Sequence, residues 1–259
     1  MKDRRAIMKR VKRLVVKVGT SILTNRKNRL DASYLEELVE DIAGLRNRGL
    51  EVSLVTSGAI AAGLKSLKLA SRPRDLASLQ AAAAIGQSNL MRTYERLFKE
   101  QGYLVGQVLL TRDVVNNRDR FGNARNTLDR LLSCGVVPII NENDAVAVEE
   151  IRFGDNDTLS ALVLKLTAAD LLIILSDVDG LQVEGRLCPE VARIDARISR
   201  AAQGSQSDKT VGGMTTKLEA ARLVTAEGKP MIIANGREER ILNRILDGEK
   251  LGTFFRPAG

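Results

Sequence analysis

The chain has 259 residues, of which 44% are apolar, and this length buries one large core or two modest ones, so a single α/β domain is the simplest expectation. Its sequence contains no histidine, which excludes Ser-His-Asp and Cys-His catalysis, the His-Glu-x-x-His zinc site and any imidazole proton shuttle. The net charge is +8, but most of this charge lies in the first thirteen residues, so it does not by itself indicate a nucleic-acid partner.

Residues 1–13 form a basic arm. They hold seven Lys or Arg and one Asp and so carry +6, whereas residues 14–259 hold 33 basic and 31 acidic side chains. With 3% aromatic residues, the chain has few side chains on which bases could stack. We interpret the arm as a solvated lead-in to one domain at 14–259, with an RNA-binding or targeting arm as the alternative, and we expect no nucleic-acid partner.

Membrane and metal signals are also missing from the sequence. There is no run of about 18 apolar residues and no leader of the signal-peptide type, so we expect a cytoplasmic protein without a membrane contact. The two cysteines, Cys134 and Cys188, lie far apart and lack the spacing of a zinc site. We expect them to be small buried hydrophobic side chains rather than a disulfide or metal ligands.

The first predicted strand, Leu14–Val18, is apolar and β-branched and ends at Gly19, where a loop with free amide groups begins. Lys17 lies inside this strand. A lysine is rare in a buried strand unless an anion compensates its charge. If the loop meets a phosphate, its amides and the Lys17 ammonium would converge on the same charge. A surface lysine at a strand edge is the alternative.

A helix is predicted from Asp31, because Ser33 and Glu36 have the spacing of a capping box and apolar side chains follow with a helical period up to Gly49. The strand Val52–Val55 comes next. It ends in a polar tip followed by small residues, which indicates a second strand-to-helix turn with exposed amides.

Residues 75–101 are predicted to form a long helix with an unusual patch of small side chains at Ala81–Ala84. Small side chains let another backbone or helix come close, so this helix is either tightly packed inside the molecule or part of a subunit interface. We favour the interface because larger apolar side chains continue the patch, namely Leu90, Met91, Tyr94 and Leu97.

Three further apolar runs are predicted strands, at Val105–Leu110, Val136–Ile140 and Leu171–Leu175. Helices are expected between them, one ending near residue 134 and one at Leu159–Leu166. Polar clusters lie near the strand ends, at 141–144, 153–158 and 176–180. Alternating strands and helices favour a parallel sheet covered on both faces, and ligands of such sheets lie at the carboxyl ends of the strands.

The stretch 184–210 is polar and without periodicity, and we interpret it as a mobile loop or lid. The segment Val211–Lys217 opens the next helix with glycines, hydroxyls and a lysine. It is not a Walker A loop, because no glycine directly precedes Lys-Ser/Thr, but its groups are similar. The strand Met231–Ala234, the helix Glu238–Leu246 and a last strand at Gly252–Phe255 complete the chain.

The lysines, glycine-rich turns and acidic or amide side chains at the strand ends are the groups of phosphoryl transfer, in which a protein mainly positions reactants and offsets negative charge. The absence of histidine favours a carboxylate as acceptor, since a carboxylate with a pKa near 4.3 is already ionised and needs no base. An alcohol acceptor would leave only aspartates as bases. Each group also has a structural explanation, because Asp157 or Asp177 alone could cap a helix.

Seven segments resemble the amino acid kinase family, in chain order and over nearly the whole chain: VVKVGTS, VTSGAIAAG, GQVLLTR, RFGNARNTL, PIINENDAV, GDNDTLSAL and VGGMTTK. INENDAV followed by GDND is similar to the glutamate 5-kinase branch and distinguishes it from the aspartate and acetylglutamate kinases. The resemblance implies a three-layer αβα sandwich around a mainly parallel sheet. It also implies ATP-dependent phosphorylation of the side-chain carboxylate of L-glutamate to L-glutamate 5-phosphate, which opens proline biosynthesis, with Mg²⁺ held mainly by the nucleotide.

The resemblance further assigns residues. Lys17 and Lys217 would bind ATP phosphates and stabilise the transferred group from two sides, and Asp157 would orient both lysines. Glutamate would be held by Ser57, Asp144 and Asn156, the last two near its α-amino group. The ATP site would comprise Lys17, Gly19, Ser176, Asp177, Val211, Gly212, Gly213, Met214, Thr215, Thr216 and Lys217. No metal ligand from the protein is expected.

The sequence departs from the family pattern in two respects. Many members carry a further PUA domain after the kinase domain, and none is expected here. Val211 stands where the family usually has a hydroxyl, and the loop before it is short, which bears on nucleotide affinity. Homodimers or homotetramers and inhibition by proline are frequent in the family. The alternatives are a kinase for another acid or for uridylate, a catalytically silent amino-acid sensor of the same fold, or an RNA-binding protein.

Overall fold

The computed structural model describes residues 3–25, 29–67, 73, 75–146, 156–203 and 213–258. Its strands are β1 Arg13–Val18, β2 Glu51–Val55, β3 Val105–Leu110, β4 Val137–Glu142, β5 Leu171–Ser176, β6 Gln182–Val183, β7 Arg186–Leu187, β8 Glu190–Val191, β9 Met231–Asn235 and β10 Thr253–Phe255. Every strand predicted from the sequence is present, with ends that differ by no more than two residues.

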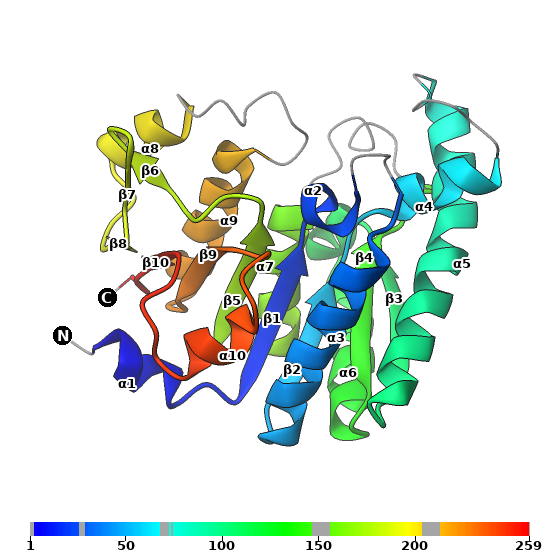
Figure 1. Cartoon of the computed structure of the whole chain (residues 1–259), viewed down its shortest axis with the longest axis horizontal. Helices are drawn as coiled ribbons and strands as arrows, with labels where there is room; N and C mark the ends of the chain where they lie inside the picture. Colours follow the sequence, from blue (N-terminus) through cyan, green and yellow to red (C-terminus); the bar gives the residue numbers. More distant parts are fainter. Residues whose placement is uncertain are drawn as a thin grey trace.

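Eight of the strands form one twisted sheet in the order β3-β4-β2-β1-β5-β9-β10-β8 (Figure 1). All neighbouring strands are parallel except β9 and β10, which are antiparallel. The strands β6 and β7 pair separately as an antiparallel hairpin. All six residues of β5 are buried, as is expected of a central strand covered on both faces. The predicted mainly parallel sheet is thereby confirmed.

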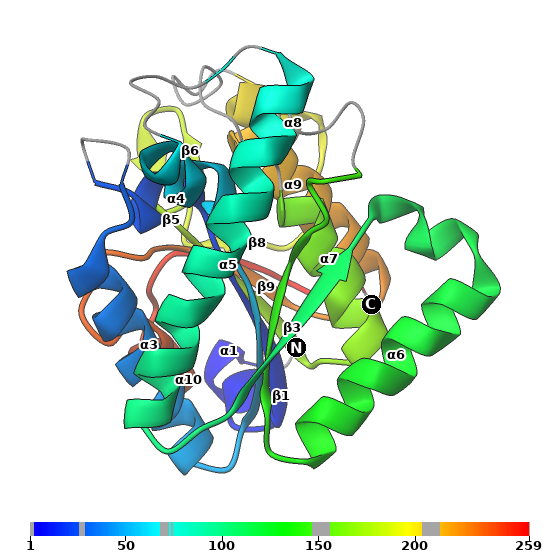
Figure 2. The ribbon, with the colours of Figure 1, turned by 90° about the vertical axis from the view of Figure 1, so that its right-hand side faces the viewer.

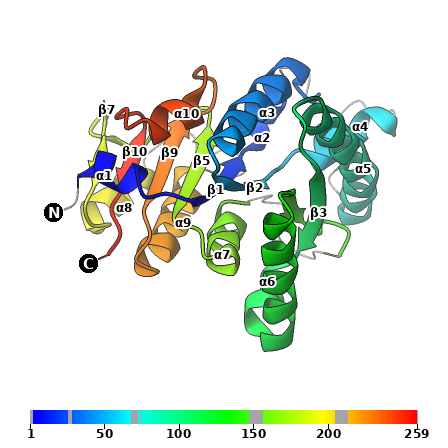
Figure 3. The same cartoon turned by 90° about the horizontal axis from the view of Figure 1, so that it is seen from below.

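Helices cover both faces of the sheet, and the three layers are visible from below in Figure 3 and from the side in Figure 2. One face carries α3 Ala32–Asn47, α5 Leu76–Glu100 and α10 Ile241–Leu246, and the other carries α6 Arg118–Ser133, α7 Asn156–Thr167 and α9 Met214–Ala226. The short helices are α1 Arg4–Met8, α2 Thr20–Leu23, α4 Ala59–Ser66, η1 Arg112–Asn116 and α8 Ala196–Gln203. The predicted αβα sandwich is confirmed.

The core is divided by the sheet because side chains alternate along each strand. Val16 of β1 and Leu54 of β2 belong to the cluster that packs under α3, α5 and α10. Val15 and Val55, their neighbours in sequence, belong to the cluster under α7 and α9. Since β1, β2, β4 and β5 run parallel, their carboxyl ends share one rim of the sheet, toward the top of Figure 1.

Part of the basic arm packs on the body of the molecule. Met8 and Val11 are buried in the core. The Arg4 guanidinium donates to the Leu251 carbonyl at 2.6 Å and lies 5.5 Å from the centre of the Phe254 ring. These contacts bury apolar surface and engage a charge. The interpretation of the arm as merely solvated is therefore wrong for this part of it.

One face of the helix α5 packs on the core of this chain, and the other face is exposed. Leu90, Tyr94 and Leu97 are buried in the core of this chain, so the subunit-interface interpretation is wrong for them. The small patch serves close packing on α4 instead. A Cβ atom at Gly86 would lie 1.7 Å from the Ala59 carbonyl oxygen, which shows that the two helices touch through their backbones.

The N-terminus of α3 is capped by Asp31, whose carboxylate accepts a hydrogen bond from the Tyr34 N–H at 3.4 Å. The predicted capping box of Ser33 and Glu36 is therefore wrong, because both residues already lie inside the helix. The predicted end is confirmed: α3 stops at residue 47, and Gly49 follows with a φ of +84°.

The stretch predicted as a mobile loop contains regular structure. Within 184–203 lie β7, β8 and α8, and Val191 and Ala202 are buried in the core under α9. The prediction is wrong there because these elements are too short to show a period in the sequence. The remaining residues of the stretch, 204–210, lie outside the described part of the chain.

Two expectations concern the surface. Across the described ranges, no helix combines the length and the hydropathy needed to cross a membrane. Both cysteines are free thiols. Cys134 is exposed at the end of α6 and Cys188 is half-buried, so the expectation that both are buried is wrong.

Candidate active site

Lys17 lies near the carboxyl end of β1, in the middle of the sheet. Its backbone pairs with Val55 of β2 and Ile174 of β5, and the residue is only 3% exposed. The surface-lysine alternative is therefore wrong. The chain turns directly after β1, where the Gly19 N–H donates to the Leu175 carbonyl at 3.3 Å. The Lys17 ammonium thus lies at the rim shared by the strand ends.

Asp157 joins Lys17 to Lys217. Its carboxylate contacts the Lys17 Nζ through Oδ1 at 2.5 Å and the Lys217 Nζ through Oδ2 at 3.3 Å. The Asp157 side chain is 0% exposed, and both lysines are buried. The three residues come from the first turn of α7, from β1 and from the first turn of α9, so three separate segments meet here. Together these three groups carry one net positive charge, which favours an anionic ligand beside them.

The start of α9 contributes to the same cluster. The Thr216 hydroxyl donates to Asp157 Oδ2 at 3.0 Å and lies 2.9 Å from the Gly213 carbonyl oxygen, so the hydroxyl is shared between them. Gly213 is the N-cap residue of α9 and Met214 is buried behind it. Thr215 is exposed at this end of the helix. The predicted nucleotide residues Val211 and Gly212 lie outside the described residues.

A second cluster consists of amide and hydroxyl groups and adjoins the first through the peptide between Asn156 and Asp157. The Asn156 Nδ2 donates to the Thr56 carbonyl at 2.5 Å and to Asn141 Oδ1 at 2.7 Å, and it lies 3.3 Å from the Ser57 Oγ. Thr56 and Ser57 follow β2, and Asn141 lies near the end of β4. The structure thus brings together Ser57 and Asn156, two of the residues predicted to bind glutamate.

Sequence reasoning missed two members of this second cluster. Asn141 holds Asn156, and Gln87 of α5 accepts a hydrogen bond from the Asn141 Nδ2 at 2.8 Å. Asn141 lies in the motif PIINENDAV at a strand end, and this position would have been enough to predict it as a site residue. Gln87 gave no signal, because a glutamine inside a long helix is ordinary and its partner is 54 residues away.

The other predicted site residues lie at the same rim without joining either cluster by the hydrogen bonds described above. Asp144 is half-buried in the turn after β4. Ser176, the last residue of β5, is buried and donates to the exposed Asp177 carboxylate at 3.1 Å. The register of β1 with β5 pairs Val18 with Leu175, which places Ser176 next to the turn at Gly19. The assigned roles of these residues stay predictions.

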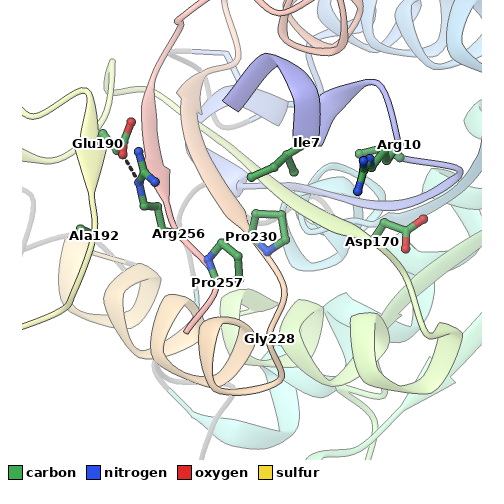
Figure 4. A pocket seen from close by; sticks show the side chains of 10 residues that line it. Ile7, Arg10, Asp170, Glu190, Ala192, Gly228, Pro230, Arg256 and Pro257 are labelled. Carbon is green, nitrogen blue, oxygen red and sulfur yellow. Dashed lines mark hydrogen bonds and ion pairs between the residues drawn. The ribbon is translucent and has the colours of Figure 1, made fainter. Parts of the chain in front are cut away.

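A cavity of about 620 Å³ lies at the opposite rim (Figure 4). Asp170 and Pro230, which line it, directly precede β5 and β9, whereas Lys17 lies at the carboxyl ends. Its acidic side chains are engaged: Glu190 pairs with Arg256, and Asp170 pairs with Lys229 at 3.2 Å. The cavity is therefore separate from the two clusters described above.

The sequence pattern of the amino acid kinase family matches residues 12–235. The chain belongs to the amino acid kinase family. The match begins just before β1 and ends with β9, so it includes every residue of both clusters. In this amino acid kinase the lysines, the carboxylate and the amides therefore all come from the family domain.

Curated relatives named glutamate 5-kinase match nearly the whole chain. The protein of Geobacter sp. (strain M21) is 49% identical over 263 residues, which cover 99% of this chain and 70% of the relative. The protein of Clostridium acetobutylicum is 46% identical over 264 residues, which cover 99% of both chains. Amino acid kinases of this name thus occur in a longer form and in a form of about the present length.

Two solved structures of other kinases share the fold. The carbamate kinase from Giardia lamblia bound to AMP-PNP superimposes with a TM-score of 0.68 at 18% identity, over 96% of this chain and all of that one. The UMP kinase from Bacillus anthracis superimposes with a TM-score of 0.64 at 15% identity, over 96% of this chain and 97% of that one. At these identities the likeness shows the fold alone.

Proposed function

We propose that the protein transfers the γ-phosphoryl group of ATP to the side-chain carboxylate of L-glutamate and forms L-glutamate 5-phosphate, the first step of proline biosynthesis. The relatives of known name support the reaction. The observation that carries the proposal within the molecule is the meeting of two buried ammonium groups, Lys17 and Lys217, on one carboxylate at the carboxyl rim of a parallel sheet.

The two ammonium groups are suited to a migrating phosphoryl group. Negative charge spreads over the phosphoryl oxygens in the transition state, and fixed cations stabilise it without reorganisation. Lys17 would act from the strand side and Lys217 from the helix side. Asp157 would hold both ammonium groups in place before the substrates arrive, as a positioning residue, since pre-organised charge is more effective than charge that must first be gathered.

A carboxylate acceptor fits a chain that has no histidine. Its oxygen is ionised at neutral pH, attacks the γ-phosphorus directly and displaces ADP, so no proton has to be removed. The bond that forms joins a carboxylate oxygen to phosphorus, and the bond that breaks joins phosphorus to the bridging oxygen of ADP. The chain's residues need only orient the two substrates and exclude water.

Glutamate would lie between the two clusters. Its side-chain carboxylate would face Lys17 and Lys217, and its α-amino end would face Ser57 and Asn156. Asp144 would pair with the α-ammonium group in a charge-assisted contact. This orientation of glutamate is supported by α7, because Asn156 of the second cluster and Asp157 of the lysine cluster are neighbours in its first turn.

ATP would occupy the rim beside β5 and the start of α9. We assign this role to Lys17, Gly19, Ser176, Asp177, Gly213, Met214, Thr215, Thr216 and Lys217, with Val211 and Gly212 proposed from the sequence. No group of three acidic, cysteine or histidine side chains able to hold a metal ion is found within the described ranges. We propose that Mg²⁺ arrives with the triphosphate and neutralises part of its charge, since Mg²⁺ in kinases is bound largely by phosphates and water.

The main alternatives make different chemical demands. A uridylate acceptor would need cations where the structure has the amide cluster of Ser57, Asn141 and Asn156. A silent amino-acid sensor would have no use for two buried lysines on a shared carboxylate. Neither alternative has a specific observation in its favour, and homo-oligomers and a cytoplasmic location stay proposals that rest on the family.

The test is the identity of the acceptor. The protein is incubated with Mg-ATP, hydroxylamine and, in turn, L-glutamate, L-aspartate or N-acetyl-L-glutamate, and the acyl hydroxamate is measured. We expect hydroxamate with glutamate and less than a tenth as much with the other acids, a preference of about 1.4 kcal/mol or more. Hydroxamate with another acid would reject the substrate, and none with any acid would favour the sensor.

A further inference from the structure

Gln87 belongs to the second cluster although it lies on a helix whose other buried side chains are mostly apolar. It is 9% exposed and faces the end of β4 from α5. Its preceding residue, Gly86, lies directly on the α4 backbone, where even a Cβ atom would overlap the Ala59 carbonyl. The helix is therefore fixed closely enough to hold a side chain at a defined place.

The hydrogen-bond directions in the cluster are determined by two backbone groups. The Glu142 N–H donates to Asn141 Oδ1 at 2.9 Å, and the Thr56 carbonyl accepts from Asn156 Nδ2 at 2.5 Å. Backbone groups cannot exchange donor for acceptor, so the orientations of both amides follow from them. Asn141 must then present its Nδ2 to Gln87, and Gln87 must accept through Oε1.

The hydrogen-bonded series Gln87–Asn141–Asn156 forms a relay. Two atoms of this relay, one donor and one acceptor, have no partner among the described residues. The Gln87 Nε2 is buried and donates no hydrogen bond within the described ranges, which is unfavourable. The Asn156 Oδ1 accepts none of the described hydrogen bonds, which all involve its Nδ2. A cluster that keeps a buried donor unpaired in order to present an oxygen is typical of a binding site.

We propose that Gln87 is a positioning residue for the amino-acid substrate: it fixes Asn141, and through Asn141 the Asn156 amide, so that Asn156 Oδ1 faces the α-ammonium group. The proposal rests on the proposed function. Without the Gln87 oxygen, Asn141 Nδ2 becomes a buried donor without an acceptor, and it turns toward another acceptor at the expense of its contact with Asn156. The lysine cluster contains no atom of this relay and keeps its geometry.

The experiment compares Gln87→Met, which removes the accepting oxygen at similar volume, with Gln87→Glu, which retains an acceptor for Asn141. For Gln87→Met we expect the KM for glutamate to rise about tenfold and kcat to stay within about twofold. Gln87→Glu should restore the KM to within about threefold of the unsubstituted protein. Gln101→Met, at the exposed end of the same helix, is the control and should change neither value.

A second measurement separates positioning from general disruption. Glutarate has both carboxylates of glutamate but no ammonium group, so its competitive inhibition constant should stay within about twofold in Gln87→Met while the KM for glutamate rises. An equal loss for both ligands, an unchanged KM, or no rescue by Gln87→Glu would overturn the proposal. If Gln87→Met does not fold, Gln87→Leu takes its place with the same expectation.

The two proposals fail separately. If the unsubstituted protein neither phosphorylates nor binds glutamate, the proposed function falls and the role of Gln87 falls with it. If the unsubstituted protein phosphorylates glutamate and Gln87→Met behaves like it toward both ligands, only the role of Gln87 is rejected.

Discussion

We propose that the contribution of Lys217 grows between the bound state and the transition state. Its ammonium pairs with Asp157, and Lys17 contacts the same carboxylate, so Lys17 keeps this partner when Lys217 is replaced. We predict that Lys217→Ala lowers kcat by about 10² or more and changes the affinity for glutamate by less than about threefold.

The control for this substitution is Lys165→Ala, which removes an exposed lysine from α7 together with its surface pair to Glu227. Steady-state kinetics and calorimetric titration with glutamate measure the two quantities. A turnover number like that of the unsubstituted protein would refute the role of Lys217. Weaker glutamate binding in step with lower turnover would show that Lys217 acts on the ground state as well.

Single site residues could be predicted from the sequence where the pattern of neighbouring residues marks them. Lys17 stood inside an apolar strand before a glycine, and a charge in that place requires a partner. Asp157 and Lys217 stood at predicted helix starts, and the structure brings all three together. Gln87 was not predictable, because its position depends on how α5 crosses the end of β4, which no spacing along the chain encodes.

The pairing of α4 with α5 is the structural element that positions Gln87 of the second cluster. Gly63 and Gly86 allow the contact, since a Cβ atom at Gly63 would lie 1.9 Å from the Ala82 carbonyl oxygen. Besides Gln87, α5 holds Tyr94, whose hydroxyl lies 2.8 Å from the Thr56 hydroxyl oxygen. Burial raises the pKa of Tyr94 well above its ordinary value, so this phenol stays neutral and keeps its hydrogen bond.

We therefore predict that Gly86→Ala destabilises the protein by at least about 2 kcal/mol, because the methyl group must push two backbones apart. In the folded fraction of Gly86→Ala the KM for glutamate should rise, because Gln87 moves together with the displaced helix α5. Urea denaturation measures the first effect. Gly122→Ala in α6 is the matched control: its Cβ meets nothing within 4 Å, and we expect it to stabilise by about 0.5–1 kcal/mol. Equal effects of the two substitutions would contradict the interlocked packing.

Asp170 directly precedes β5 and joins the amino end of β1 to Lys229, two residues before β9. Burial alone would raise the pKa of the Asp170 carboxyl. The N–H groups of Lys12 and Arg13 and the Lys229 ammonium together lower this pKa by more than burial raises it, so the net shift is downward. Their distances to the carboxylate are 3.0, 3.2 and 3.2 Å. A carboxyl with a lowered pKa in the folded state stabilises above its unfolded value of about 3.9 and ceases to do so as the pH falls.

The expected outcome for Asp170→Asn is a loss of about 1 kcal/mol of stability at neutral pH, since the group is partly exposed and its charge is screened. The difference between the two proteins should shrink as the pH is lowered from about 5 to about 2, where the carboxyl of the unsubstituted protein becomes protonated. Chemical denaturation over this pH range measures it. A difference that is constant with pH would show that the charge of Asp170 contributes nothing.

Elements with a strong period or a clear breaker were predictable, and those defined by packing were not. β3 was predicted residue for residue, and the end of α3 at Gly49 was predicted from the glycine. The interpretation of Leu90, Tyr94 and Leu97 as interface residues failed because a row of apolar side chains does not show whether its partner lies in the same chain. The short elements β7, β8 and α8 were not predicted, because two to eight residues are too few to show a periodic pattern of apolar side chains.

For the molecule as a whole, the fold class followed from the alternation of strands and helices. The rule that parallel sheets bind ligands at the carboxyl ends of their strands predicted one rim for Lys17, Asp157 and Lys217, and the structure brings these side chains together there. The order of the strands explains why. β1 lies between β2 and β5, so its lysine is flanked by the polar ends of both neighbours. The second rim, with its cavity and paired charges, joins the arm to the sheet and contains none of the site residues.

In the proposed reaction the two lysines direct a phosphoryl group onto a carboxylate oxygen and not onto water. The most direct measurement uses glutamate labelled with ¹⁸O in its side-chain carboxylate, Mg-ATP and hydroxylamine, followed by mass analysis of the released phosphate. Hydroxylamine attacks the acyl carbon, so the oxygen that linked carbon to phosphorus leaves with the phosphate. We predict one ¹⁸O in each phosphate released with hydroxamate. Consumption of ATP with unlabelled phosphate alone would mean that water is the acceptor and would contradict the account.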